Sequence, residues 1–427
     1  MTKQELKDAA CKIIDERRDE IINIGETIRV NPELGYKEYK TAAFVESIYE
    51  KMGLEYENKI AITGSMATLK GKSSKVKLAV MGELDAIIIP THPQADPETG
   101  AAHSCGHFMQ VATMLGVGMA LKFSGAMEHL DGDVVLVATP AEEAVEIEYR
   151  NGLIEQGIIE FVGGKQEMIA KGYFDDIDMA MMCHGITSED IQLAETSVGV
   201  LIKYVKYIGK AAHAGAAPHL GINALNAANL GLTAVHMQRE TFKDEDTIRV
   251  HPIIIKGGDL VNVVPEDVRI ETYVRGKTMD GIIDASKKVN RALKAGADAI
   301  GASVEIKEIP GYMPRFNNKI MNELFYENAV AVVGKDKVTN NGHTTGSSDF
   351  GDIMHIMPGI HPYIGGASGV GHSGDYQVAD PDLYYIAPTK AMAMTAIDLL
   401  YDNAAAAHNV LENYTPVYKN KEEFVAA

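Results

Sequence analysis

The sequence predicts an α/β protein in which a smaller domain is inserted into a larger one. In the first and last parts of the chain, short aliphatic runs alternate with segments of helical periodicity, which is typical of a mixed sheet flanked by helices. A different order of elements, β-α-β-β-α-β, occupies the middle. The chain has 427 residues, which is too many for one ordinary core, so two domains are expected.

The strands expected in the larger domain are aliphatic runs that end in polar residues. They are KVKLAVMGELDA, GDVVLVATPAEE and DIDMAMMCHG, and each has the composition of a strand that is buried on both faces. HFMQVATMLGVGMALKF and DLYYIAPTKAMAMTAIDLLYDNAA have the length and periodicity of helices. Strands that alternate with helices in this way indicate a sheet covered by helices on both faces.

The inserted domain is expected to contain four strands and two helices. The strands are GVLIKYVKYIGK, DTIRVHPIIIKGG, EDVRIETYVRGK and SVEIKEIPGY, and the helices are NALNAANLGLTAVHMQRE and MDGIIDASKKVNRALKAGADAIG. Their order is the ferredoxin-like pattern. We therefore expect one domain over residues 1–198 and 313–427 and a second over residues 199–312.

The composition is that of a soluble globular protein, with 46% hydrophobic and 23% charged residues. A formal charge of −19 disfavours nucleic acid and anionic membrane as partners, because both are bound through basic patches. No apolar run reaches the roughly 18–20 residues of a membrane helix, and the N-terminus reads as a charged amphipathic helix, not a signal peptide. The three cysteines, Cys11, Cys105 and Cys183, form no disulfide framework. These properties predict a cytoplasmic protein.

The run HSCGH places Cys105 and His107 just before an expected helix. Backbone N–H groups and the helix dipole at such a position favour a thiolate, and thiolate and imidazole both bind metals such as zinc. A single Cys-Gly-His, taken alone, is more often a structural helix start than a set of metal ligands. The neighbouring His103 is expected to lie beside the site without binding metal.

Other polar residues follow the ends of further expected strands. Glu142 and Glu143 follow GDVVLVATP, and His184 follows DMAMMC. In open α/β sheets, ligands gather at the carboxyl ends of strands. His372 lies in the glycine-rich stretch GVGHSGDY, and Asp85 of GELDA is suited to accept a hydrogen bond from a ligand histidine. Each also has a structural explanation, such as a solvated helix start for the glutamates.

These motifs occur together in one order along nearly the whole chain. NPELGYKEYKTAAFVESIYEKMGL is followed by GELDA, HSCGH, TPAEE, MCHG, GKAAHAGAAPHLGINALNAA, GGDLVNVVP, SSDF and GHS. In this order the chain resembles the M20 metallopeptidase family of amidohydrolases, aminoacylases and carboxypeptidases. The cysteine in place of a carboxylate ligand resembles the branch with the indole-acetyl-amino-acid hydrolases. TPAEE, the KAAHA…GINAL run and RVHPIIIKGG look closest to the aminobenzoyl-glutamate hydrolases and related hydrolases of dipeptide-like amides.

The resemblance implies a hydrolase that cleaves the amide bond of an N-acyl or N-aroyl amino acid, or of a dipeptide-like substrate, and releases a free amino acid. It implies a catalytic domain over 1–198 and 313–427 that holds two divalent metal ions, zinc first, with manganese or cobalt as alternatives. A metal-activated water would attack the amide, with Glu142 as general base. The implied metal ligands are Cys105, His107, Glu143, His184 and His372.

The resemblance also implies roles for the inserted domain, 199–312, as a lid and a dimerisation domain. His213 would contact the scissile carbonyl, often from the partner subunit of a homodimer. Asn262 and Arg275 would hold the substrate carboxylate or nearby backbone, a task for which the arginine fork is suited. Small amide or dipeptide substrates are the expected partners.

The chain departs from the family pattern at two places beside the site. Phe108 and Met109 follow CGH, where the branch usually has an aspartate or asparagine, and AVEIEYRNG follows AEE, where relatives often have glycines. Both departures leave the implied metal ligands intact, but the identity of the substrate cannot be carried over from the relatives. Two other interpretations also remain: a family member without catalysis that acts as a binding or scaffold protein, and a cysteine hydrolase in which Cys105 is the nucleophile and His107 the base.

Overall fold

The structure is a computed structural model, and it describes residues 1–426. The chain forms two compact units. The first comprises Met1–Thr196, Phe316–Thr344 and the chain from Asp352 on, and the second comprises Ser197–Arg315 with Thr345–Gly351. This division lies close to the expected boundaries, and the short stretch Thr345–Gly351 is an addition to the second unit that the sequence pattern did not indicate.

The first unit is built on a six-stranded sheet with the order β1-β2-β6-β3-β7-β17. These strands are Tyr56–Ile60 (β1), Gly64–Leu69 (β2), Lys77–Glu83 (β3), Asp133–Thr139 (β6), Met179–Met181 (β7) and Gly359–Ile360 (β17). The four strands from β6 to β17 are parallel, and β2 pairs with β6 in the antiparallel sense. Every residue of β6 is buried, as expected for a central strand with a continuous aliphatic sequence.

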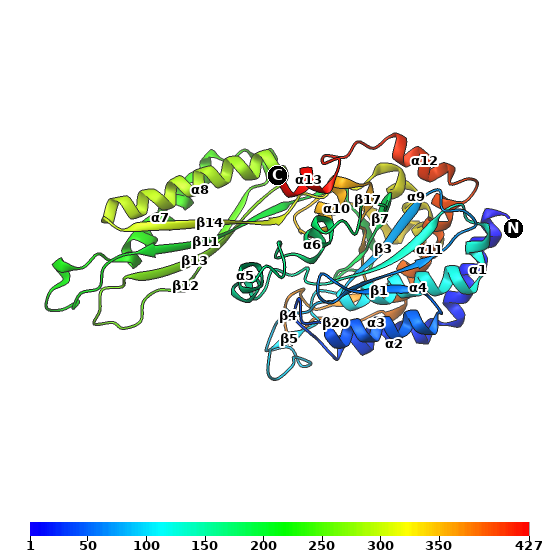
Figure 1. The fold of residues 1–427 in the computed structure, drawn as a ribbon, viewed down its shortest axis with the longest axis horizontal. Helices are drawn as coiled ribbons and strands as arrows, with labels where there is room; N and C mark the ends of the chain where they lie inside the picture. The colour runs from blue at the N-terminus through cyan, green and yellow to red at the C-terminus, as the bar shows by residue number, and fades with distance from the viewer. Residues whose placement is uncertain (427) are drawn as a thin grey trace. The chain divides into compact units, whose positions relative to one another are not determined.

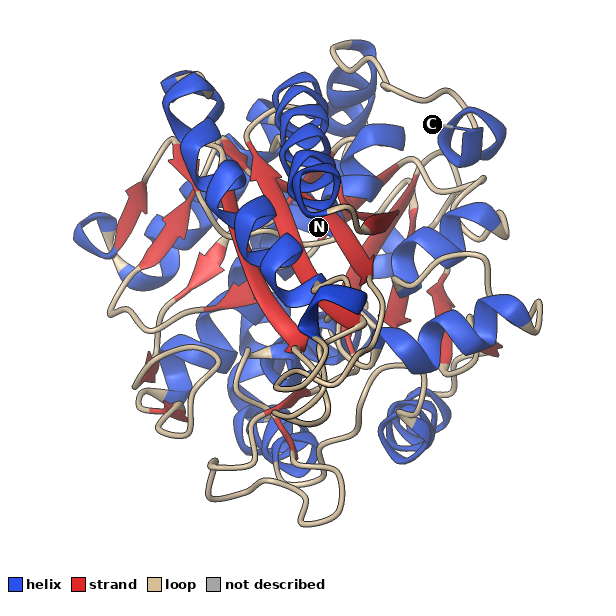
Figure 2. Ribbon diagram, turned by 90° about the vertical axis from the view of Figure 1, so that its left-hand side faces the viewer, coloured by secondary structure: helices blue, strands red, loops and turns tan. Residues whose placement is uncertain are grey.

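Within residues 1–426, the first unit also contains eleven α-helices, and Figure 2 shows helices in blue and strands in red. They are α1 (Lys3–Glu16), α2 (Arg18–Arg29), α3 (Tyr39–Lys51), α4 (His107–Phe123), α5 (Ile147–Glu155), α6 (Gly164–Ala170), α9 (Lys319–Val333), α10 (Phe350–Ile356), α11 (Ala387–Leu400), α12 (Ala405–Glu412) and α13 (Lys421–Ala426). α4 is buried over most of its length, which explains why its sequence is apolar on all sides. The largest hydrophobic core of the first unit joins α4, α11 and the central strands.

Short strands complete the first unit at the ends of the main strands. They are β4 (Ile87–Ile88), β5 (Ala101–Ala102), β8 (His184–Gly185), β9 (Ile191–Leu193), β15 (Val338–Asn340), β18 (Tyr363–Ile364), β19 (Ala367–Ser368) and β20 (Gln377–Val378), while β10 (Thr196–Ser197) pairs with β16 (His343–Thr344). Among the described residues, no helix is long and apolar enough to cross a membrane.

The second unit has the predicted ferredoxin-like order of elements. Its strands are β11 (Gly199–Ile208), β12 (Arg249–Lys256), β13 (Asp267–Gly276) and β14 (Ser303–Tyr312), and its helices are α7 (Ala224–Met237) and α8 (Met279–Ile300). The antiparallel sheet has the order β12-β13-β11-β14, and α7 and α8 lie side by side on one of its faces (Figure 1). β13 alternates strictly between buried and half-buried residues, because only one face of this sheet is covered by helices. The predicted fold class, a mixed α/β domain with an inserted ferredoxin-like domain, is therefore confirmed.

Candidate functional site

Three parallel strands of the first unit end at the same edge of the sheet, and each delivers polar residues there. β3 ends at Glu83 and is followed by Asp85, β6 is followed by Glu142 and Glu143, and His184 follows β7. Because β3 pairs in parallel with both β6 and β7, these residues leave the sheet at one edge. The sequence pattern alone predicted this meeting of strand ends.

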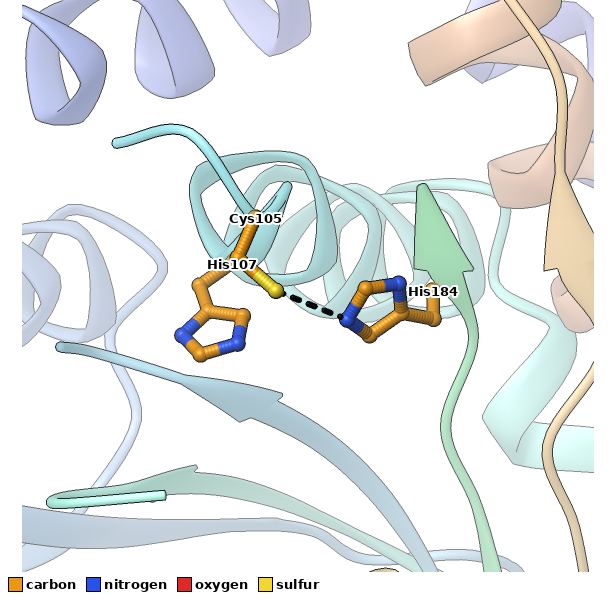
Figure 3. A group of neighbouring side chains, drawn as sticks. All are labelled: Cys105, His107 and His184. Atoms are coloured by element: carbon orange, nitrogen blue, oxygen red, sulfur yellow. Dashed lines mark hydrogen bonds between the residues drawn. The ribbon is translucent and has the colours of Figure 1, made fainter. Parts of the chain in front are cut away.

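Cys105 and His107 reach the same edge through a sharp turn at the start of α4. Gly106, between them, is the N-cap of α4 and has a φ of 104°, a left-handed conformation that favours glycine. A Cβ atom there would also lie 2.8 Å from the hydroxyl of Tyr384. The glycine therefore lets both flanking side chains leave the turn toward the strand ends. Figure 3 shows Cys105 and His107 on the same side of this turn, with His184 opposite them.

The thiol of Cys105 lies at the centre of a group of metal-binding side chains. Its Sγ atom is 3.4 Å from Nε2 of His184 and 3.2 Å from Nε2 of His372. His372 Nε2 is also 3.3 Å from Oε1 of Glu143. Two triads of ligand atoms result, each within 4.8 Å: Cys105 with His107 and His184, and Cys105 with Glu143 and His372. These two triads share the sulfur atom, and a third group, Glu83 with His107 and Glu142, meets the same distance limit. The residues present could therefore hold more than one divalent ion.

His107 is buried and is oriented by Asp85. Its Nδ1 atom lies 2.8 Å from the backbone oxygen of Asp85 and 3.2 Å from the carboxylate Oδ1. This contact turns Nε2 toward the site, where it is 3.7 Å from Oε2 of Glu142. Within the described chain Nε2 makes no hydrogen bond. The same nitrogen lies 3.1 Å from Oε2 of Glu83, so it faces two acidic side chains, and a metal ion could bind among these atoms.

The charges of the site suit a thiolate ligand. Burial and the nearby Glu143 raise the pKa of the Cys105 thiol, but His184 and His107 outweigh both and bring this pKa to about 6. Hydrogen bonds to Cys105 and Glu143 raise the pKa of His372 to about 11. Burial raises the pKa of the Glu143 carboxyl, but the neighbouring His372 outweighs this effect and brings the pKa of Glu143 to about 2. Sulfur and carboxylate are thus both ionised at neutral pH, as metal ligands must be, whereas His372 has to release a proton before it can bind a metal ion.

His372 is brought to the site by a loop that is fastened to the HSCGH run. Its backbone N–H donates to the backbone oxygen of Ser104 at 2.8 Å. The next residue, Ser373, donates its N–H to Oγ of Ser104 at 3.0 Å, and its backbone oxygen accepts a hydrogen bond from that hydroxyl at 2.7 Å. His372 itself has a φ of 62°, which is unusual for a residue with a side chain. The loop is therefore held in one conformation by the stretch that carries Cys105.

A buried ion pair beneath the site was not predicted. Nζ of Lys165 lies 2.5 Å from Oε1 of Glu83, and both side chains are fully buried. Oε2 of Glu83 accepts a hydrogen bond from Gln110 at 2.7 Å and lies 3.1 Å from Nε2 of His107. Burial raises the pKa of Glu83, but Lys165 and His107 outweigh it and bring this pKa to about 2. Glu83 was visible in GELDA, but nothing in the sequence linked it to Lys165, 82 positions later.

His103, Phe108 and Met109 lie next to the site without facing the metal-binding side chains. His103 is buried, which lowers its pKa to about 3 and keeps the ring neutral, and it belongs to neither triad. Phe108 packs against Tyr384 and Tyr385 in the main core, and Met109 accepts a hydrogen bond from Thr113. Phe108 and Met109 are therefore core residues.

The three predicted residues of the second unit lie in two groups. His213 is exposed, its Nδ1 accepts hydrogen bonds from the N–H groups of Gly215 and Ala216, and its Nε2 is 3.4 Å from Nδ2 of Asn262. Arg275 lies near the end of β13, where it donates to Ser347 at 3.2 Å. The structure brings His213 and Asn262 together, and it keeps Arg275 apart from them at the other end of the sheet.

A protein-family model decides which family this chain represents. The model of peptidase family M20/M25/M40 matches residues 79–393, which is well over half of the chain. The chain belongs to this family. Membership makes it a hydrolase of amide bonds, and the predicted family and enzyme class are confirmed.

Known members of the M20 family resemble the chain over most of its length. It is 29% identical to an Xaa-Arg dipeptidase of Mus musculus, covering 93% of this chain and 90% of the relative. It is 24% identical to an IAA-amino acid hydrolase of Arabidopsis thaliana, covering 81% and 77%. A dinuclear metal binding M20 peptidase of Bacillus subtilis has a similar structure, with a TM-score of 0.65 and 20% identity over 90% of this chain and 99% of the other. An aminobenzoyl-glutamate utilization protein of Klebsiella pneumoniae has a TM-score of 0.68 and 18% identity over 91% and 97%.

Proposed function

We propose that the protein is a metal-dependent amidohydrolase that releases a free amino acid from an N-acyl amino acid or a dipeptide, with Glu142 as general base. The observation that carries the proposal is the pair of ligand triads that share the Cys105 sulfur. One thiolate, three imidazoles and one carboxylate make up the donor set, and zinc prefers such ligands. Manganese and cobalt are the alternatives.

The residues present fit two divalent ions. His107 and His184 would hold one ion and Glu143 and His372 the other, with Cys105 bound to both. The buried Nε2 of His107 lies 3.1 Å from Oε2 of Glu83 and 3.7 Å from Oε2 of Glu142, so it faces acidic oxygen atoms among which a cation would be favourable. When bound, the two ions supply Lewis-acid chemistry that polarises an amide carbonyl and makes a water molecule acidic.

Glu142 would handle the protons of the reaction. It lies directly beside the ligand Glu143 in the chain, and its Oε2 is 3.7 Å from Nε2 of His107, so it faces the same space as the metal-binding atoms. Glu142 is 5% exposed, and a carboxylate with so little water around it is suited to accept a proton from the attacking water and to pass it to the leaving nitrogen. Asp85 would hold the ring of His107 in place through the contact between its backbone oxygen and Nδ1 of His107.

Arg275 is proposed to bind the carboxylate of the substrate, and His213 the carbonyl of the amide. Arg275 has a planar guanidinium, which can bind a carboxylate through two parallel N–H donors, and it lies near the end of β13. The mouse relative is named an Xaa-Arg dipeptidase, which favours dipeptides with a C-terminal arginine as the first substrates to test.

The distance between His213 and Arg275 within the second unit supports action of His213 from a partner subunit. Arg275 on β13 pairs with Val200 at the start of β11. The two strands run antiparallel from there, and beyond the far end of this pairing His213 forms a bridge with Val263. From position 263 to position 275 is 12 residues, or roughly 30–40 Å along an extended chain. A dipeptide spans only about 7 Å. One substrate could then meet both residues only if they came from two chains.

The edge of the second unit's sheet supports a homodimer. β12 is an edge strand, and Ile253 and Ile255 on it are 59% and 46% exposed. Val261, in the loop that follows, is 99% exposed. An unpaired edge strand with exposed aliphatic residues favours pairing with another chain, and a second copy of this chain would satisfy the backbone groups of both edges.

The decisive test of the function is the Glu142→Gln variant. Loss of a general base lowers the rate by about 100- to 10,000-fold, so turnover of Xaa-Arg dipeptides and N-acyl amino acids should nearly vanish. Metal content by elemental analysis should stay at the wild-type value, because Glu142 is not one of the proposed ligands. Near wild-type turnover in this variant would show that Glu142 is not the base.

Mixed dimers test the role of His213. His213→Ala and Glu142→Gln variants are each expected to be inactive. If His213 acts in the partner's site, mixing and reassembling the two should restore about a quarter of wild-type activity, because half of the dimers are mixed and each holds one complete site. No recovery in verified mixed dimers would mean that His213 acts within its own chain or not at all.

A further inference from the structure

The backbone that carries Glu142 and Glu143 is held by charged side chains from distant parts of the chain. The N–H of Ala141 donates to Oε1 of Glu38 at 2.8 Å, and the N–H of Glu143 donates to Oδ2 of Asp85 at 2.9 Å. Ala141 has a φ of 53°, so this turn adopts a conformation that alanine rarely takes without external support. The direction of both glutamates therefore depends on what holds the turn.

The third of these side chains is Arg150, from helix α5 in the segment between AEE and GGK. One terminal nitrogen of its guanidinium donates to the backbone oxygen of Glu143 at 2.5 Å. The other donates to the backbone oxygen of Val162 at 2.8 Å and lies 3.5 Å from that of Ala141. The guanidinium also lies 5.5 Å from the centre of the Tyr36 ring. Arg150 thus links the backbone at Ala141 and Glu143, which precedes α5, to the backbone at Val162, which follows it.

Arg150 is only 1% exposed, although it is a charged residue on a short helix. Within the described chain its hydrogen bonds go to backbone oxygens, and its Nε atom has no partner. Burying a cation among carbonyl groups is costly compared with pairing it with a carboxylate. Arginine, with its planar fork, can nevertheless bind several carbonyl oxygens at fixed angles, which neither lysine nor methionine can do.

Gly35 makes room for this guanidinium. A Cβ atom at position 35 would lie 2.3 Å from one terminal nitrogen of Arg150 and 2.9 Å from the Cα of Ala141. Gly35 belongs to NPELGYKE, the same stretch that supplies Glu38 to the N–H of Ala141. The segment 35–38 therefore contributes twice to the turn at Ala141. Glu38 accepts a hydrogen bond from this turn, and Gly35 leaves space for the Arg150 guanidinium beside it.

From these contacts we infer that Arg150 is a positioning residue of the site: by fixing the carbonyl groups of Ala141 and Glu143, it sets the direction in which Glu142 and Glu143 point. The inference rests on the proposed function, and it gives a role to the segment 144–163, which replaces the glycines expected after AEE. This segment contributes through its buried arginine to the geometry of two carboxylates that precede it in the chain.

Arg150→Met and Arg150→Lys test the inference. Misplacement of a reacting group by about 1 Å costs on the order of 100-fold in rate, so kcat should fall roughly 10- to 100-fold in Arg150→Met while KM changes little. Because Glu143 is a proposed ligand of one ion only, titration with zinc should show weaker binding of one of the two ions. Arg150→Lys should recover only a small part of either loss, since one ammonium cannot reproduce the fork.

Controls separate positioning from a loss of folding. Glu155→Gln changes an exposed residue at the end of the same helix and should leave kcat and zinc binding unchanged. Circular dichroism and thermal unfolding of each metal-free variant measure the folded fraction. Wild-type kcat and zinc affinity per folded molecule in Arg150→Met would overturn the inference. The zinc titration needs no substrate, so failure of the proposed activity and failure of the Arg150 inference give different results.

Discussion

The Nε2 atom of His372 lies 3.2 Å from the Sγ atom of Cys105, although the two residues are 267 positions apart in the chain. The contact depends on two backbone features: the left-handed glycine that follows Cys105 and the loop that Ser104 fastens beside it. A thiol between His372 and His184 is the structural basis for the proposed bridge between two metal ions.

The bridge predicts unequal effects of removing single ligands. Cys105→Ser should weaken the binding of both ions, because each triad includes the sulfur. His184→Ala and His372→Ala should each weaken one ion and leave the other in place. Elemental analysis after dialysis against limiting chelator, together with isothermal titration, measures the stoichiometry. If Cys105→Ser loses only one ion, or if His184→Ala loses both, the shared-sulfur arrangement is wrong.

Removal of metal separates the proposed mechanism from a cysteine hydrolase. The lowered pKa of Cys105 and its two histidine neighbours would also suit a nucleophile. Dialysis against a strong chelator should abolish activity, and added zinc, manganese or cobalt should restore it. Iodoacetamide should react with Cys105 only in the metal-free protein. Full activity after verified metal removal would instead favour Cys105 as the nucleophile.

The sequence predicted the elements and the strand ends of the site because both follow from local patterns. Aliphatic runs that end in GELDA, TPAEE and MCHG mark where parallel strands stop, and parallel strands stop at one edge. The helix His107–Phe123 and the strand Ser303–Tyr312 occupy the stretches that periodicity indicated. The candidate metal ligands could be named for this reason, together with the order of motifs along the chain, and their binding of metal stays a prediction.

The supporting contacts could not be predicted, because they depend on tertiary structure. Glu38, Arg150 and Lys165 all look like surface residues in the sequence, yet all three are buried in the structure. The segment EIEYRNGLIEQGIIEFVGGKQEM has the charged composition of a surface segment, but α5 and α6 each place one cation in the interior. No local pattern distinguishes such a cation from a solvated one, since the partners lie up to 82 positions away.

The buried pair of Lys165 and Glu83 predicts a large effect of Lys165→Met on stability. Removing Lys165 leaves the buried Glu83 carboxylate with Gln110 and His107 as its remaining partners, and the loss of one partner of a buried ion pair costs about 3–5 kcal/mol. The double variant Lys165→Met/Glu83→Gln should regain much of this loss, because the buried carboxylate is then absent. Urea unfolding of the metal-free proteins, followed by circular dichroism, measures both. Wild-type stability of Lys165→Met would show that the ion pair contributes little, and equal stability of the single and double variants would show that the remaining carboxylate is not the cause of the loss.

The second unit carries a further prediction, on pH. Glu308 accepts hydrogen bonds from the buried Lys203, from Ser286 at 2.6 Å and from Asn290 at 2.8 Å. Burial of the Glu308 carboxylate raises its pKa, but these donors outweigh it and bring the pKa from 4.5 to about 2. A carboxylate with a lowered folded pKa stabilises the fold above its unfolded pKa, and this contribution is lost as the pH falls from about 4.5 toward 2.

Glu308→Gln should therefore lower the thermal unfolding midpoint at pH 7 and flatten its decline on acidification. The variant has no carboxylate to protonate, so the difference from the wild type should be constant above pH 5 and should shrink between about pH 4.5 and 2. Glu305→Gln, an exposed position on the same strand β14, is the matched control and should follow the wild-type curve. Parallel curves for wild type and Glu308→Gln down to pH 2 would contradict the linkage, because the carboxylate would then contribute nothing that acid can remove.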